Sequence, residues 1–316
     1  MSRLPSGPGV YRFRDGAGRV LYIGRAGSLR RRVGSYWRDL GDRPHLARMV
    51  TQIGRVEAVL CASEHEAAWL ERNLLERSIP RWNRTAGGQE VEVYVRLSAS
   101  PRSPGLSVVH EPRTPGAAVR YFGPYLGGAR VRLAVAGLHR IFPLAYAADA
   151  PLGSMAAMAA ERRVCGADRT GLAGQIAAVL GRDPAAVADA RERLVARREA
   201  AAAAEAFEVA GRIQAELAAL DWVTCPQRVT VPAGGDALVA GWADGVLVRF
   251  EIAGGRMSGW RQYQRTRAQA DRWLARTPPH WREFAAENAA LAAALTEGPA
   301  GAARGPGRPE SAGLAG

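Results

Sequence analysis

The sequence predicts an α+β fold that opens with a compact unit of three short strands and several helices. Residues 9–13 and 19–23 are β-prone runs, and the Asp15-Gly16 pair between them is a strong hairpin signal. Residues 55–63 form a third β-prone run. At 316 residues the chain is long enough for two or three such units.

Helices are predicted in the same unit near 28–39 and 43–54. A further helix begins with a capping box, because Glu66 follows Ser63 by three residues. It is expected to end near Ser78, since Pro80 cannot continue it.

The middle of the chain changes pattern twice. VEVYVRLS, near the start of 91–150, alternates like a strand, and a proline-rich loop follows. VRYFGPYLGGARVRLAVAGLHRIF predicts a strand, a Gly-Pro turn and a helix, whereas 151–181 has weak periodicity. Asp183-Pro184 suits a helix start, and the run of helix formers to Trp222 is too long for one globular helix. We expect an antiparallel helical pair that breaks near 202–206.

The last third returns to a β pattern. Turn signals at Asp244-Gly245 and Gly254-Gly255 divide residues 223–265, and a helix is predicted near 267–296. The Gly-, Pro- and Ala-rich end is predicted to be a disordered tail. The chain is thus expected to divide into five segments: 1–90, 91–181, 182–222, 223–296 and the tail 297–316.

The charge of the chain favours a polyanionic partner. The net charge is +13, and all 43 basic residues are arginine, whose planar fork suits phosphate oxygens. A GC-rich genome is the alternative explanation for the absence of lysine. Residues 1–90 hold 16 arginines against 9 acidic residues, so the excess is strong in the N-terminal unit.

The cysteine and hydropathy patterns predict a cytoplasmic protein. The three cysteines are odd in number and far apart, which fits a reducing compartment rather than a disulfide framework. The N-terminus has no apolar run of signal-peptide length, and no segment approaches a membrane span. A soluble protein with no membrane partner is expected.

One carboxylate falls on an apolar helix face. Glu71 lies three or four residues from Ala67, Ala68, Leu74 and Leu75, so it sits on or beside the buried stripe of its helix. A carboxylate there is costly unless it is paired or binds a metal. Either it forms an ion pair with a nearby arginine, or it is a metal ligand or acid-base group.

Arg32 borders a similar stripe on the helix near 28–39, formed by Leu29, Val33 and Tyr36. If the first hairpin aligns its strands, Tyr11 and Tyr22 come close to Arg32. The alternative is that both tyrosines are ordinary strand residues.

Four motifs together carry a family resemblance. They are GVY at 9–11, YIG at 22–24, the arginine ten residues after the second tyrosine, and SEHEAAWLERNLLERSIPRWN at 63–83. In this order and spacing they resemble the GIY-YIG nuclease domain, and more narrowly the UvrC family of excision-repair proteins. YFGPY and its following helix also resemble UvrC, as does AEAFEVAGRIQAEL at 204–217, which is similar to the motif that docks on UvrB. The resemblance covers about 7–265 and implies a small domain with a three-stranded antiparallel sheet flanked by helices.

The chain also departs from the family pattern. Only Cys165 lies within 151–175, where UvrC carries its iron–sulfur ligands, so no cluster is expected. Arg25 stands where lysine is usual, and Trp82 where tyrosine is usual. The sequence ends before the second nuclease domain, so the resemblance is to a shortened UvrC-like or Cho-like form without that C-terminal half.

The resemblance implies roles for individual residues. Glu71 matches the ligand of one divalent ion, Mg²⁺ or Mn²⁺, and Arg32 would share the charge that builds on the phosphoryl group. Tyr22 matches the group that activates or orients the attacking water, with Tyr11 nearby. A phenol with a pKa near 10 is a poor base, so a cation must lower that pKa or metal-bound water must help.

The remaining candidate residues have positioning or binding roles. Tyr36 and Asn83 match active-site positions and are interpreted as positioning groups. Arg25, Arg30 and Arg31 suit contacts to the DNA backbone, although plain solvation also explains Arg30 and Arg31.

The implied activity is a single metal-dependent incision in damaged DNA, 3′ to the lesion, by an endonuclease that UvrB recruits through 204–217. One alternative is a DNA- or UvrB-binding module whose catalysis has decayed. Another is a GIY-YIG nuclease that serves a different DNA-processing pathway.

Overall fold

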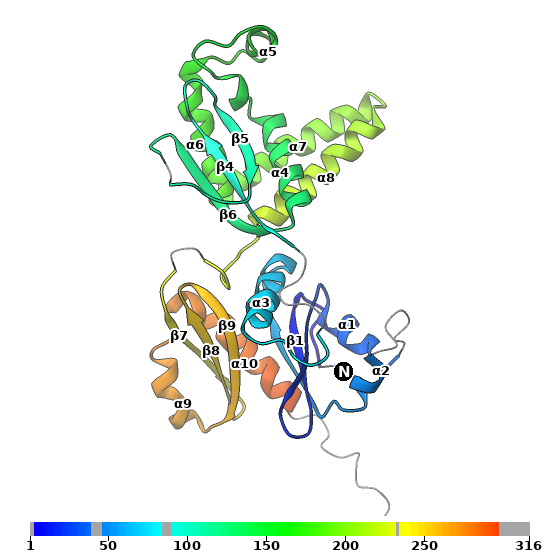
Figure 1. The fold of residues 1–316 in the computed structure, drawn as a ribbon. Coiled ribbons are helices and arrows are strands. Elements are labelled where there is room, and N and C mark those ends of the chain that lie inside the picture. The colour runs from blue at the N-terminus through cyan, green and yellow to red at the C-terminus, as the bar shows by residue number, and fades with distance from the viewer. Residues whose placement is uncertain (1–2, 39–45, 84–89, 115, 232–233, 297–316) are drawn as a thin grey trace, which may run out of the picture.

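A computed structural model describes residues 3–38, 46–83, 90–114, 116–231 and 234–296. The predicted tail 297–316 and the start of the helix predicted at 43–54 lie outside these residues. In Figure 1 the central region forms the upper part of the molecule, and both ends of the described chain form the lower part.

The N-terminal unit confirms the α+β prediction. Its sheet is antiparallel with the order β2-β1-β3. The strands are β1 (Gly9–Arg14), β2 (Val20–Ala26) and β3 (Arg55–Leu60), and the helices are α1 (Leu29–Ser35), α2 (Ala47–Val50) and α3 (Glu64–Arg77). Ser63 caps α3 as predicted, since its hydroxyl accepts the Glu66 amide hydrogen at 3.0 Å.

Two glycines of the sequence motifs are required by close packing. A Cβ on Gly24 would lie 2.6 Å from the Tyr11 Oη, so this glycine makes room for the phenol. A Cβ on Gly9 would lie 2.3 Å from the Val59 carbonyl oxygen on β3. The glycines of GVY and YIG therefore let the sheet close around the first tyrosine.

The central region contains a second antiparallel sheet, in the order β5-β4-β6, and a helical layer. Its strands are β4 (Glu92–Ser98), β5 (Gly105–Val109) and β6 (Val119–Leu126). Its helices are α4 (Gly128–Ile141), α5 (Ser154–Arg162), α6 (Arg169–Leu180), α7 (Pro184–Ala203) and α8 (Phe207–Thr224). The helix pair α7 and α8 breaks at 204–206, as predicted.

Two predictions for this region were wrong. The proline-rich stretch after β4 was predicted as loop but holds β5, a half-buried edge strand whose signal is weak because only one side is paired. Gly123-Pro124 was predicted as a turn but lies inside β6. The register shift between Val93 and Val95 of the paired strand accommodates a proline that cannot donate to the ladder.

The C-terminal sheet has the antiparallel order β7-β8-β9, with the predicted turns at Asp244-Gly245 and Gly254-Gly255. Its strands are β7 (Ala237–Ala243), β8 (Val246–Ala253) and β9 (Arg256–Gln264). The single helix predicted near 267–296 is wrong: α9 (Arg267–Leu274) and α10 (Arg282–Thr296) are separate helices. Pro278 and Pro279 interrupt them, because neither can donate an intrahelical hydrogen bond.

The C-terminal sheet packs on the N-terminal unit. A single hydrophobic cluster combines buried residues of β1, β2, β3 and α3 with those of β7, β8, β9 and α10. Asn73 of α3 adds polar contacts between the two units. Its Nδ2 donates to the Thr230 Oγ1 at 2.9 Å and to the Met257 carbonyl at 3.1 Å. The five-segment division of the chain stays a prediction. The hydrophobic cluster described above includes residues of both the 1–90 and the 223–296 segments. Among the described residues no helix is long and apolar enough to cross a membrane.

Candidate active site

Three tyrosines from separate elements meet beside the N-terminal sheet. Tyr11 comes from β1, Tyr22 from β2, and Tyr36 caps the C-terminus of α1. The ring of Tyr22 lies 6.2 Å from each of the other two, centroid to centroid. The Tyr11 and Tyr36 hydroxyl oxygens are 2.8 Å apart and share a hydrogen bond. The hairpin alignment needed to bring the tyrosines together is therefore present.

Arg32 lies in the last turn of α1 and faces this cluster. Its guanidinium carbon is 5.7 Å from the centroid of the Tyr36 ring. Arg32 is partly buried, whereas Arg30 and Arg31 on the same helix are exposed. The helical spacing thus separates one arginine that faces the tyrosines from two that do not.

Burial controls the protonation of the phenols. It raises the pKa of Tyr22 well above its ordinary value of 10, and the neighbouring Tyr36 raises it further. Arg32 opposes this change but does not overcome it. The pKa of Tyr11 is raised for the same reasons. Burial thus favours the protonated form of both phenols.

Glu71 lies on α3 and faces the end of β2. Its Oε1 accepts a hydrogen bond from the Arg25 backbone N–H at 3.1 Å, and its Oε2 is 3.3 Å from the Arg25 Nε. Burial raises the pKa of Glu71, with Arg25 acting in the opposite direction. The side chain keeps 21% of its surface exposed, so a small cation can still reach it. The ion pair that the sequence left open is present, and it leaves room for metal binding.

Glu90 holds the far end of the Arg25 guanidinium. The Arg25 Nη2 is 3.2 Å from the Glu90 Oε1. Sequence reasoning missed this residue, because Glu90 lies 19 residues beyond Glu71 in a stretch with no helical or strand register to it. Arg25, predicted to contact DNA, is thus shared by two carboxylates.

Asn83 fixes the free edge of the sheet. Its Oδ1 accepts from the Ile23 N–H at 2.9 Å, and its Nδ2 donates to the Ile23 carbonyl at 2.8 Å. The Trp82 N–H donates to the Leu21 carbonyl at 3.2 Å, which extends the same contact. Asn83 therefore holds the strand that carries Tyr22, in keeping with a positioning role.

The exposed arginines differ in how they are held. The Arg30 Nε donates to the Leu4 carbonyl at 2.7 Å, which ties α1 to the N-terminal segment. Arg31 is exposed and has no ion pair within the part of the chain that the structure describes. Of the three predicted DNA contacts, Arg31 is the one whose guanidinium is available without breaking a described interaction.

The donor set at Glu71 fits a hard divalent cation. No cluster of three or more His, Cys, Asp or Glu side chains that could hold a metal occurs among the described residues. A site with one carboxylate suits Mg²⁺, which keeps several waters and takes few protein ligands. Glu71 is accessible, and its two oxygens offer the ligand type that such an ion prefers.

Comparison with known proteins identifies the N-terminal unit. Residues 7–84 match the family model described as the UvrC-like GIY-YIG domain. The UvrABC system protein C of Geobacter metallireducens is 32% identical over 283 residues, which cover 83% of this chain and 44% of that protein. The corresponding protein of Mycobacterium sp. strain KMS is 35% identical over 283 residues, covering 82% of this chain and 40% of its own length.

A solved structure also aligns with this unit. It is the GIY-YIG N-terminal endonuclease domain of UvrC from Thermotoga maritima, bound to magnesium. It is 32% identical, covers 26% of this chain and 88% of that chain, and has a TM-score of 0.24.

The motif residues, the matched range and the tyrosine–arginine–glutamate site define a GIY-YIG domain at residues 7–84. With relatives that align over more than four-fifths of its length, the chain is a UvrC-like GIY-YIG protein. It spans less than half the length of these two relatives.

Proposed function

We propose that this protein is a metal-dependent DNA endonuclease of nucleotide excision repair that makes one incision, 3′ to a lesion. The observation that carries the proposal is the placement of Glu71. Both Tyr22 and Arg32 interact electrostatically with this carboxylate. A phenol and a guanidinium therefore lie near the side chain that would bind the cation. That combination suits a phosphodiester, which needs charge stabilisation and an oriented water.

Each side chain has a distinct part in the proposed reaction. A divalent cation bound at Glu71 supplies Lewis-acid stabilisation of the phosphoryl oxygens. Arg32 adds positive charge on the side of the tyrosine cluster. The protonated Tyr22 orients the attacking water by hydrogen bonding, while Tyr11 and Tyr36 hold the cluster through their shared hydrogen bond. The proton of the attacking water passes to solvent.

A direct assay tests the function. Purified protein is mixed with a duplex that carries one lesion, with and without Mg²⁺ and UvrB, and the cut is mapped on both sides of the lesion. A single Mg²⁺-dependent cut on the 3′ side is expected. Binding without cutting would favour the decayed module. Equal cutting of undamaged DNA, with no response to UvrB, would favour another DNA-processing pathway.

Tyr22→Phe is expected to slow nicking about 100-fold. The change keeps the ring and its packing but removes the hydroxyl that orients the water, and such groups contribute about 10²- to 10⁴-fold. The rate is measured in single-turnover nicking, with circular dichroism to verify folding. Tyr263→Phe on β9 removes a phenol away from the site and serves as control. Nicking by Tyr22→Phe at the rate of this control would remove Tyr22 from the mechanism.

The helical pair supports a protein partner. At the start of α8, Phe207 exposes 70% of its surface and Val209 exposes 45%. Exposed large apolar side chains at a hairpin tip are suited to docking. We propose that residues 204–217, which begin at this tip, contact UvrB.

Phe207→Ala is expected to weaken UvrB binding about 30-fold. An exposed aromatic anchor of an interface is worth about 2 kcal/mol, and this energy sets the factor. Isothermal titration with UvrB measures the affinity. Leu152→Ala removes a side chain that is 82% exposed but lies away from the tip. Equal affinities for the two variants would exclude the tip as the docking site.

A further inference from the structure

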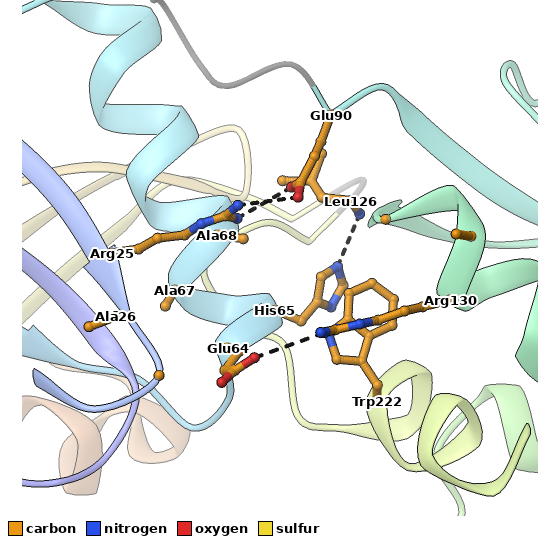
Figure 2. Close-up of a pocket in the computed structure, with 13 residues that line it drawn as sticks. Arg25, Ala26, Glu64, His65, Ala67, Ala68, Glu90, Leu126, Arg130 and Trp222 are labelled. Carbon is orange, nitrogen blue, oxygen red and sulfur yellow. Dashed lines mark hydrogen bonds and ion pairs between the residues drawn. The ribbon is translucent and has the colours of Figure 1, made fainter. Parts of the chain in front are cut away.

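A pocket of about 440 Å³ lies where the N-terminal unit meets the central region. Figure 2 shows Arg25 and the N-terminal part of α3 on one side, and Arg130 and Trp222 on the other. Arg25 also pairs with Glu71, so the pocket begins beside the candidate metal ligand. Several of the sequence motifs contribute to its walls, but the pocket itself was not predicted, because those motifs are far apart in the sequence.

The first turn of α4 faces this pocket without a cap. Its N-cap is Gly127, which has a φ of +119° and no side chain to accept the first amide hydrogens. The first intrahelical donor is the Val131 N–H, which bonds to the Gly127 carbonyl. The amides of Gly128, Ala129 and Arg130 therefore precede the helical ladder. Free amides and the positive end of the helix dipole favour an anion at this place.

The charges in this turn oppose helix stability. The first turn has no acidic residue and carries Arg130, although a cation near a helix N-terminus is unfavourable. Gly127 is also required by packing, because a Cβ there would lie 3.2 Å from the Trp222 ring. Among the described residues, Arg130 is compensated only by contacts from other elements: a long ion pair with Glu64 at 3.9 Å and the Trp222 ring, whose centroid lies 5.4 Å from the guanidinium carbon. A turn that breaks a local stability rule in this way is a candidate for a binding function.

His65 provides an independent observation. It lines the pocket and is 1% exposed. Its Nε2 accepts hydrogen bonds from the Trp69 indole N–H and from the Leu126 backbone N–H, so the ring proton is on Nδ1. That Nδ1 donor has no partner among the described residues. Because His65 lines the pocket, a ligand oxygen that displaced the covering side chains would satisfy this donor.

Three arginines converge around this histidine. Burial lowers the pKa of His65 to about 3, and Arg182, Arg130 and Arg25 each lower it further. Two carboxylates face them: Glu90 pairs with Arg25, and Glu64 lies 3.9 Å from the Arg130 Nη1. The second pair is long and exposed on both sides, so it holds Arg130 weakly. Arg130 is thus the cation of the pocket most easily released to a ligand.

We infer that this pocket binds a backbone phosphate of the DNA strand that is cut at Glu71. The first-turn amides of α4 and the side chain of Arg130 hold the phosphate from the central region, and Arg25 links it to the active site. This inference rests on the proposed function. It makes the central region part of the substrate-binding surface, rather than only a connection to the helical pair.

The salt dependence of DNA binding tests the inference. The full chain binds a labelled duplex in EDTA, so that no cutting occurs, and anisotropy gives the affinity between 50 and 200 mM salt. Arg130→Gln is expected to reduce the slope of log affinity against log salt by about 0.9, the contribution of one phosphate contact. Arg162→Gln is the matched control, since Arg162 is exposed on α5 and does not line the pocket. An unchanged slope in Arg130→Gln, or an equal loss in Arg162→Gln, overturns the inference.

A second variant separates binding from folding. Gly128→Asp adds a carboxylate at the first position of α4, where a new Cβ would lie 3.5 Å from Val93 and 3.6 Å from the Arg132 Nη1. The acid suits the helix dipole and the Arg132 guanidinium, so the melting temperature is expected to hold or rise, while DNA affinity falls several-fold because the carboxylate occupies the place of the phosphate. Unchanged affinity contradicts the inference. Because these measurements need no cutting, the phosphate site and the nuclease assignment fail independently.

Discussion

Replacing Glu71 with glutamine is expected to reduce Mg²⁺-dependent nicking about a thousand-fold or more. A bound cation is worth several kcal/mol of transition-state stabilisation, and each 1.36 kcal/mol changes the rate tenfold. Glutamine keeps the acceptor for the Arg25 backbone N–H at 3.1 Å but removes the negative charge that attracts the cation. Folding is expected to persist, because burial already disfavours the charged form of Glu71.

The measurement is single-turnover nicking of a lesion duplex across a range of Mg²⁺ concentrations, with DNA binding measured in EDTA. Glu76→Gln is the matched control, since it makes the same charge change on an exposed position of the same helix. Loss of nicking with retained DNA binding in Glu71→Gln, but not in Glu76→Gln, is the expected pattern. Nicking by Glu71→Gln at the wild-type rate would contradict the nuclease assignment.

The N-terminal unit was predictable because its signals are local. The hairpin depends on Asp15, whose Oδ1 accepts the backbone N–H groups of Ala17 and Arg19 at 3.0 and 2.9 Å. The start of α3 depends on Ser63 and Glu66, three residues apart. Helical spacing alone separated Arg32 from its neighbours on α1. In each case the interacting groups lie within a few residues, so sequence order specifies the geometry.

The rest depends on contacts that no local pattern encodes. Glu66 was predicted as a capping residue, yet its carboxylate is fully buried and its Oε1 also accepts from the Arg228 N–H, 162 residues away. Glu90 and Trp222 line the pocket beside the candidate active site and come from distant parts of the sequence. The predicted turn at Gly123-Pro124 failed because pairing with β4 overrode a local turn signal. The candidate catalytic residues could be proposed from motif spacing and the family resemblance, whereas the pocket beside them required the tertiary fold.

A buried charge cluster joins the nuclease unit to the C-terminal sheet. Glu57 on β3 is 1% exposed and pairs with Arg12, Arg14 and Arg55. The Arg12 Nη2 donates to the Trp260 carbonyl at 2.8 Å, and its guanidinium carbon lies 3.9 Å from the Trp260 ring centroid. Burial lowers the pKa of Arg12 to about 10, and the Glu57 carboxylate acts in the opposite direction.

Glu57→Gln is therefore expected to destabilise the protein by about 3–5 kcal/mol, the range for removing one partner of a buried ion pair. Urea unfolding at pH 7 measures the loss. Glu199→Gln, which removes an exposed carboxylate paired with Arg198 at 3.4 Å, is expected to cost less than about 1 kcal/mol. A loss in Glu57→Gln no larger than in this control would mean that the cluster does not hold the two sheets together.

The same variant predicts a pH dependence. Burial acts to raise the pKa of Glu57, but Arg12, Arg14 and Arg55 outweigh it, so the folded-state pKa lies below its ordinary value of 4.5. The stabilising contribution of a carboxylate with a lowered pKa is complete above its unfolded value and disappears as pH falls through its folded value. The stability difference between wild type and Glu57→Gln should stay constant from pH 7 to about pH 5 and shrink below pH 4.5. A difference that is independent of pH down to pH 3 would show that the loss comes from packing rather than from the charge of Glu57.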